Sequence, residues 1–225
     1  MRCIRNISGA LIILLTVSCN PNYSKLLPAR EKHNGDEWAL SSRLVQALAL
    51  AESKYGERDL SWTILGLEFY QKKHPQTWFP GVFEGRKQIL IQLSKNSAND
   101  EKRALFEMAH EVIHCLSPRV GSDTASVLEE GLAVYFSFEY LQTAGFSIKP
   151  DEYLKDKKYK KAYDHVTKLY SSNPHADDAI KAARKNAGSF SKITALHLKE
   201  FFPGFDPAFY GFLAGNFSRS QIPSY

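Results

Sequence analysis

Two histidines four residues apart are the feature that most constrains how this 225-residue chain can fold. His110 and His114 enclose Glu111 in the segment His-Glu-Val-Ile-His, and the surrounding sequence favours a helix. At about 3.6 residues per turn, positions four apart lie one above the other. Such a helix can present both imidazoles to one metal ion, and Glu111 can reach a metal-bound water without being a ligand.

Helix boundaries around this motif follow from capping and breaking residues. The segment Asn-Asp-Glu at residues 99–101 opens the helix, and Ser117-Pro118 closes it after Leu116. A second long helix is predicted over residues 124–143, with Gly145 as its stop.

Strand signals precede this helix pair, and helix signals follow it. Residues 60–70 favour a strand, with a helix as the alternative, and residues 86–94 predict a strand. Residues 71–86 carry turn signals that separate short extended pieces. Helices are predicted over residues 37–55 (ended by Gly56), 151–172, 175–187, 191–202 and 206–217. The order predicts an α+β domain with a small mixed or antiparallel sheet, a helix pair and a mostly helical C-terminal part.

The second long helix carries the segment Glu-Glu-Gly-Leu-Ala at residues 129–133. Two histidines leave a catalytic zinc short of its usual three protein ligands, and two histidines with one glutamate are a known ligand set. A glutamate of this helix can complete the set. Gly131 has no side chain, so two helices could approach closely at the metal; in mid-helix a glycine costs about 1 kcal/mol relative to alanine.

The combination of His-Glu-x-x-His with Glu-Gly-Leu-Ala resembles the zincin superfamily of metallopeptidases, in particular its gluzincin branch. The resemblance covers about residues 86–144, a little over a quarter of the chain. It implies Zn²⁺ held by His110, His114 and Glu130 rather than Glu129, with Glu111 as the catalytic base. It also implies that the strand over residues 86–94 is a sheet edge that pairs with an extended substrate, the alternative being an ordinary core strand.

The chain departs from that family in two respects. Many gluzincins have an acidic residue four positions after the ligand glutamate, which orients a ligand histidine; here that residue is Val134, so such a partner must come from elsewhere or be absent. A downstream Tyr or His usually stabilises the transition state, and no motif places it. The candidates are Tyr159, Tyr163, His165, Tyr170 and His175, for each of which a surface or core role is favoured. Cys115 is interpreted as a buried free cysteine rather than a fourth ligand.

The N-terminal residues 1–18 have the pattern of an export signal. A basic start precedes an apolar run over residues 7–17, which is shorter than the about 20 residues of a membrane-spanning helix. The ending Leu-Thr-Val-Ser-Cys resembles a bacterial lipobox, which implies a lipid on Cys19; the alternative is a plain secretory signal. Residues 19–36 would form a tether and residues 37–225 a single domain. Asn20 favours the outer membrane if the cell is Gram-negative.

The net charge carries no sign of a nucleic-acid partner. Removing Arg2 and Arg5 with the signal lowers the formal charge from +5 to +3, and the densest basic cluster, at residues 155–161, favours a solvated helix face. The sequence thus predicts a lipid-anchored zinc peptidase that cleaves peptide or protein substrates at the cell envelope. The alternative is a non-catalytic surface lipoprotein whose zinc braces the helix pair while the domain binds a partner. The oligomeric state is not indicated.

Overall fold

A computed structural model describes residues 40–119 and 124–217. The predicted signal at residues 1–18, the lipid attachment at Cys19 and the tether at residues 19–36 lie outside the described residues. Within the part that is described, no helix combines the length and the apolar character needed to cross a membrane.

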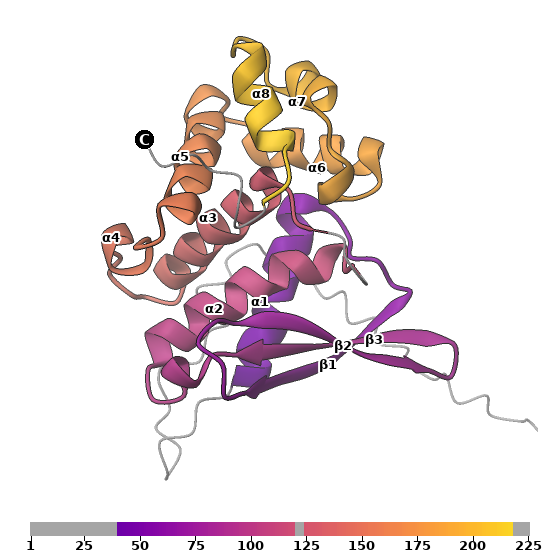
Figure 1. Ribbon diagram of the computed structural model, residues 1–225, viewed down its shortest axis with the longest axis vertical. Coiled ribbons are helices and arrows are strands. Elements are labelled where there is room, and N and C mark those ends of the chain that lie inside the picture. The colour runs from indigo at the N-terminus through magenta and orange to yellow at the C-terminus, as the bar shows by residue number, and fades with distance from the viewer. Residues whose placement is uncertain (1–39, 120–123, 218–225) are drawn as a thin grey trace, which may run out of the picture. The chain divides into compact units, whose positions relative to one another are not determined.

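The predicted α+β class is confirmed, with a small mixed sheet followed by a largely helical part (Figure 1). The strands are β1 Trp62–Phe69, β2 Gln76–Phe83 and β3 Arg86–Leu93. The α-helices are α1 Leu40–Tyr55, α2 Glu101–Leu116, α3 Val127–Thr143, α4 Pro150–Tyr153, α5 Lys157–Ser172, α6 Ala176–Ala187, α7 Ala195–Phe201 and α8 Pro207–Ala214, and short 3-10 helices are η2 Lys95–Ser97 and η3 Phe190–Lys192.

The sheet has the order β1-β3-β2, with β1 parallel and β2 antiparallel to β3. Glu84 and Gly85 join β2 to β3, and both have positive φ angles, of 48° and 74°. This is the backbone conformation that a tight two-residue hairpin requires, and glycine adopts it without steric cost. One of the turns expected within residues 71–86 is therefore present, at Glu84 and Gly85.

The prediction of short extended pieces separated by turns over residues 71–86 is wrong for residues 76–83, which form the continuous strand β2. Its pairing with β3 passes from Trp78 opposite Leu90 to Gly81 opposite Gln88, so two residues of β2 face one of β3. One of these two residues is Pro80, which lacks an N–H group and is tolerated at the bulge of an edge strand. The turn-forming residues Pro80 and Gly81 lie at a bulge within β2, and the strand continues beyond them.

The strand β3 is the central strand of the sheet, so the prediction that residues 86–94 form a sheet edge is wrong. Both sides of β3 are occupied, by β1 and by β2. Its inward residues Ile89, Ile91 and Leu93 are buried, as in the alternative of an ordinary core strand. Backbone pairing with a substrate would have to use an outer edge of β1 or β2.

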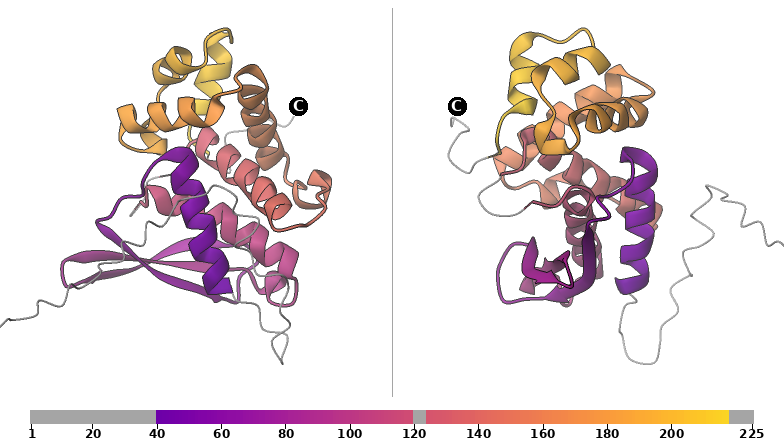
Figure 2. Two further views of the ribbon diagram at one scale, coloured as in Figure 1. Left: turned by 180° about the vertical axis from the view of Figure 1, so that it is seen from behind. Right: turned by 90° about the vertical axis from the view of Figure 1, so that its right-hand side faces the viewer.

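Helices cover one face of the sheet, and further helices pack on those helices (Figures 1 and 2). The helix α2 packs on β3 and β2, α1 contacts β1 and α2, α3 packs on α2, and α5 packs on α3. Buried apolar residues from these elements form one main core. The helix α2 is thereby held between the sheet and α3, with its residues from Glu107 to Leu116 all buried.

Some helix boundaries differ from the sequence prediction for local reasons. The helix α3 begins at Val127 rather than at residue 124, because the Ser126 side chain accepts a hydrogen bond from the Glu129 backbone N–H and caps the helix. The single helix predicted over residues 151–172 is split into α4 and α5. Between them Leu154 packs into a small apolar cluster, and Asp156 caps α5.

Candidate metal centre

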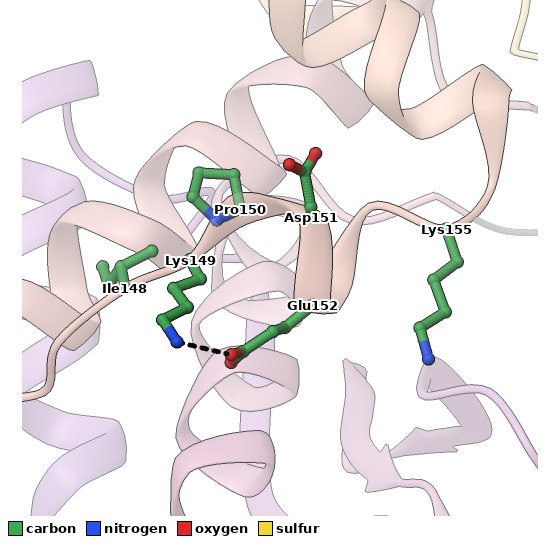
Figure 3. Close-up of a pocket in the computed structure, with 6 residues that line it drawn as sticks. All are labelled: Ile148, Lys149, Pro150, Asp151, Glu152 and Lys155. Carbon is green, nitrogen blue, oxygen red and sulfur yellow. Dashed lines mark ion pairs between the residues drawn. The ribbon is translucent and has the colours of Figure 1, made fainter.

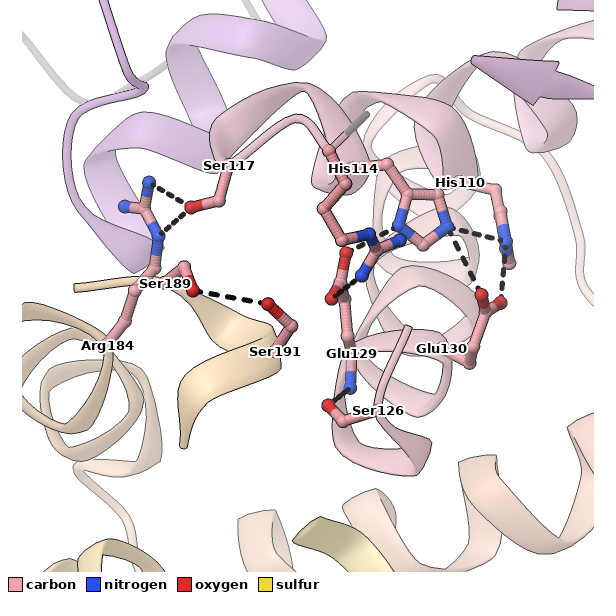
Figure 4. Close-up of polar contacts among 10 residues, drawn as sticks. His110, His114, Ser117, Ser126, Glu129, Glu130, Arg184, Ser189 and Ser191 are labelled. Atoms are coloured by element: carbon pink, nitrogen blue, oxygen red, sulfur yellow. Dashed lines mark hydrogen bonds and ion pairs between the residues drawn. The ribbon is translucent and has the colours of Figure 1, made fainter. Parts of the chain in front are cut away.

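The candidate site lies where α2 meets α3. His110, Glu111 and His114 belong to α2, and Glu130 belongs to the first turn of α3. Asp100 caps α2 by accepting from the Arg103 backbone N–H, which sets where the helix begins. All four site side chains are buried. Figure 4 shows His110, His114 and Glu130 close to one another.

The three predicted ligands come together as the sequence indicated. Ligand atoms of His110, His114 and Glu130 all lie within 4.8 Å of one another, a spacing that can hold a metal ion. The Nε2 atom of His110 is 3.2 Å from Oε2 of Glu130, and Nε2 of His114 is 3.6 Å from Oε1. The two Nε2 atoms are 3.4 Å apart. Among the described residues, no further His, Cys, Asp or Glu belongs to this group.

The polar atoms of this group fit a cation better than they fit one another. Oε2 of Glu130 is buried and has no hydrogen bond of good geometry from any described residue. Nδ1 of His114 lies 2.8 Å from a carboxylate oxygen of Glu129, which can only accept, so Nδ1 carries the proton. In the neutral ring, Nε2 of His114 then points a lone pair towards His110 and Glu130. A shared positive ion would satisfy these atoms together.

Burial and mutual charge shift the pKa values at the site. Burial raises the pKa of Glu111, although the charges of His114 and His110 oppose this rise. Burial also acts against ionisation of Glu130, but those two histidines outweigh it and lower the pKa of Glu130. For His114, burial is outweighed by Glu130 and Glu129, and the pKa rises to about 9. Glu111 therefore holds a proton more readily than an exposed glutamate does.

Glu129 and Arg119 are part of the site, and the sequence reasoning assigned neither a role there. Glu129 contributes one oxygen to His114 Nδ1, and its other oxygen accepts from Nη1 of Arg119. Both Glu129 and Glu130 lie in the first turn of α3, where the helix dipole favours a carboxylate. Adjacent helical positions differ by about 100°, so one glutamate can face each side of His114. In the sequence, the pair of adjacent glutamates was the signal that could have revealed the role of Glu129. No sequence signal indicated Arg119, because it contacts Glu129 from a different segment of the chain.

Gly131 permits a close approach of two helices, but the helix that approaches is α5 and not the helix α2 that carries the two histidines. A Cβ atom at this position would lie 2.6 Å from the Ala162 carbonyl oxygen and 2.7 Å from Cγ2 of Val166. Any side chain here would push α5 away from α3. The glycine thus brings α5 against the helix that carries Glu130.

Of the five downstream Tyr and His candidates, Tyr159 lies beside the ligand group. Its ring is 5.9 Å from that of His110, edge to face, and the residue is half-buried. The other four make contacts elsewhere or are exposed. Tyr163 contacts Tyr135 and Phe138, His165 stacks on Phe209, Tyr170 bonds to Asp177, and His175 is exposed.

The remaining sequence predictions near the motif concern Cys115 and Val134. Cys115 is a free buried cysteine outside the ligand group, as expected, and burial raises the pKa of its thiol. Val134 is buried with Phe138 and Leu154, so the helix position that carries an acid in many gluzincins is apolar here.

A surface hollow is lined by residues of α4 and of the chain on either side of it, and none of the candidate site residues lines it (Figure 3). Its lining includes Lys149 and Glu152, which form an exposed ion pair at 3.9 Å. Such a pair contributes little to stability. The hollow therefore adds no group to the candidate site.

Comparison of the chain with protein-family models, with curated proteins and with solved structures gives no match. The resemblance to gluzincins accordingly depends on the motif residues and on the arrangement in which the chain places them.

Proposed function

We propose that the protein is a zinc-dependent hydrolase that cleaves peptide bonds in peptides or proteins at the cell envelope. The observation that carries the proposal is the joint burial of His110, His114 and Glu130 around one point, with buried Glu111 near enough for their charges to shift its pKa. Two histidines and one glutamate are a ligand set of catalytic zinc, which leaves a coordination position for water or substrate.

The donor set supports zinc through its chemistry. Imidazole and carboxylate are both zinc ligands, and Glu130 has a buried oxygen without a hydrogen bond that a metal would satisfy. When bound, zinc would polarise a substrate carbonyl and lower the pKa of a water ligand to about 7.

Glu111 would act as the general base. It accepts a proton from the attacking water and later gives that proton to the leaving amine, so one proton is moved and none is lost. Its raised pKa, which burial causes, suits a group that must accept and then release a proton near neutral pH. Glu111 is outside the ligand group, so proton transfer and metal binding are assigned to different residues.

Tyr159 is the residue that we assign to the substrate oxygen. Its position on α5, beside His110, follows from the close packing of α5 on α3 at Gly131. A phenol O–H can donate a hydrogen bond to the charge that develops on a carbonyl oxygen during attack.

The experiment that tests the proposal pairs metal analysis with digestion of a broad peptide library. The purified protein should contain about one zinc per chain. Glu111→Gln should keep the zinc and reduce kcat by about 10²- to 10⁴-fold, the range of general base catalysis. The matched control is Glu107→Gln, one turn earlier on α2, which should keep the activity. Zinc bound with no hydrolysis of any peptide, protein or cell-wall substrate would contradict the proposal and leave zinc as a brace between helices.

The location at the envelope depends on Cys19. We expect metabolic labelling with a palmitate analogue to mark the wild-type protein and not the Cys19→Ala variant. Because one acyl chain binds a membrane only marginally, the two or three chains of a bacterial lipoprotein would hold the protein stably. Equal labelling of both proteins, or of neither, would contradict the anchor.

A further inference from the structure

The carboxylate of Glu129 lies between a candidate metal ligand and an arginine. Oε1 of Glu129 accepts from Nδ1 of His114 at 2.8 Å, and Oε2 accepts from Nη1 of Arg119 (Figure 4 draws the contact with His114). The side chain of Glu129 is 1% exposed. Glu129 does not belong to the ligand group, so its contact with the site passes through His114.

A histidine that binds a metal through one nitrogen needs its other nitrogen held. A hydrogen bond from the second ring nitrogen to a carboxylate fixes the tautomer and the ring orientation and increases the basicity of the ligand nitrogen. The proton on Nδ1 of His114 leaves Nε2 as the donor atom, and Nε2 is the atom that faces Glu130 and His110.

Arg119 offsets the unfavourable free energy of burying the Glu129 carboxylate. An unpaired carboxylate in the interior is strongly unfavourable, whereas one that is paired and hydrogen-bonded on both oxygens is tolerated. Arg119 belongs to the segment between α2 and α3, and Glu129 to the start of α3, where Ser126 caps the helix. The support therefore comes from one residue shortly after α2 and one residue in the first turn of α3.

We propose that Glu129, held by Arg119, is a positioning residue that fixes His114 in the orientation and tautomer needed to bind the metal. The inference rests on the proposed metal site. In this chain Glu129 takes the place of the acid that many gluzincins have four positions after the ligand glutamate, where Val134 is buried among apolar side chains. The support thus comes from the residue before the ligand and from a different segment.

The test measures the zinc dissociation constant of the full purified protein by competition with a chromophoric chelator. Glu129→Gln should bind zinc about 10- to 100-fold more weakly than the wild type, the usual effect of removing such a partner. Glu129→Asp should recover part of the loss, and Arg119→Met should weaken binding less than Glu129→Gln does. Glu107→Gln is the control, because Glu107 is a buried carboxylate on α2 that contacts serines rather than ligands.

A second measurement separates positioning from a general loss of structure. In the zinc-loaded wild type, NMR of the imidazole groups should show a proton on Nδ1 of His114 that exchanges slowly with solvent, and Glu129→Gln should speed that exchange. Native zinc affinity in Glu129→Gln, or a proton on Nε2 of His114, would overturn the inference while leaving the metal site intact. Absence of zinc binding by the wild type would overturn the proposed function as well.

Discussion

Two buried glutamates, Glu107 on α2 and Glu130 on α3, differ in the hydrogen bonds that their carboxylate oxygens accept. Glu107 accepts from the Ser94 backbone N–H at 2.8 Å, from the Ser94 hydroxyl at 2.7 Å and from the Ser97 hydroxyl at 2.9 Å. Glu130 faces two histidines, and its Oε2 atom has no hydrogen bond from the described residues.

The difference separates a structural carboxylate from one that can bind a ligand. The bonds to Glu107 fasten the end of β3 to α2, and they leave neither oxygen without a donor. At Glu130 the facing histidine nitrogens become acceptors once their protons leave, and a bound cation would then satisfy them together with the carboxylate. The same residue type at similar burial can therefore serve stability in one place and binding in the other.

The largest expected effect of this difference is stabilisation by zinc. At free zinc about 1,000 times the dissociation constant, the free energy of unfolding should rise by about 4 kcal/mol, because a ligand that binds only the folded state stabilises that state. Chemical denaturation with and without zinc measures the change. His114→Ala should show no rise, whereas His74→Ala, at an exposed position, should behave as the wild type does. An equal rise in His114→Ala would show that zinc acts elsewhere.

A smaller effect tests whether the helix that carries Glu130 is closely packed, so that the unsatisfied Oε2 atom of Glu130 cannot be explained by loose packing. Gly131→Ala should destabilise the fold by about 1–3 kcal/mol, because the added Cβ meets the backbone of α5. The control is Gly211→Ala in α8, where nothing lies within 4 Å of the added atom. That change should be neutral or stabilise by up to about 1 kcal/mol, since alanine is the better helix former. If thermal unfolding shows both variants equally stable, close packing at the ligand helix is refuted.

The local parts of the site could be predicted from the sequence because they depend on spacing within one helix. His110 and His114 share a face through helical periodicity, and Glu111 lies beside them for the same reason. Glu130 followed from a motif on the next helix, and the structure places it in the same group. Each of these predictions needed at most one helix-to-helix contact.

The parts that could not be predicted depend on contacts between distant segments. Pairing order in a sheet is a tertiary property, so the sequence of β3 did not reveal that it is central. Pro80 and Gly81 favour a turn locally, but pairing with β3 overrides that preference and produces a bulge. Arg119 has no periodic relation to Glu129, and the two residues meet only in the folded chain.

The central claim, that Glu130 is a metal ligand and Glu107 is not, is tested most directly by measuring zinc affinity and stability in the matched variants Glu130→Gln and Glu107→Gln. Glu130→Gln should lose more than about 100-fold in zinc affinity, beyond the effect expected of a residue that only orients a ligand. Glu107→Gln should keep native zinc affinity and lose about 1–3 kcal/mol of stability, because a buried donor is left without its partner. Native zinc affinity in Glu130→Gln, or an equal loss in both variants, would contradict the claim.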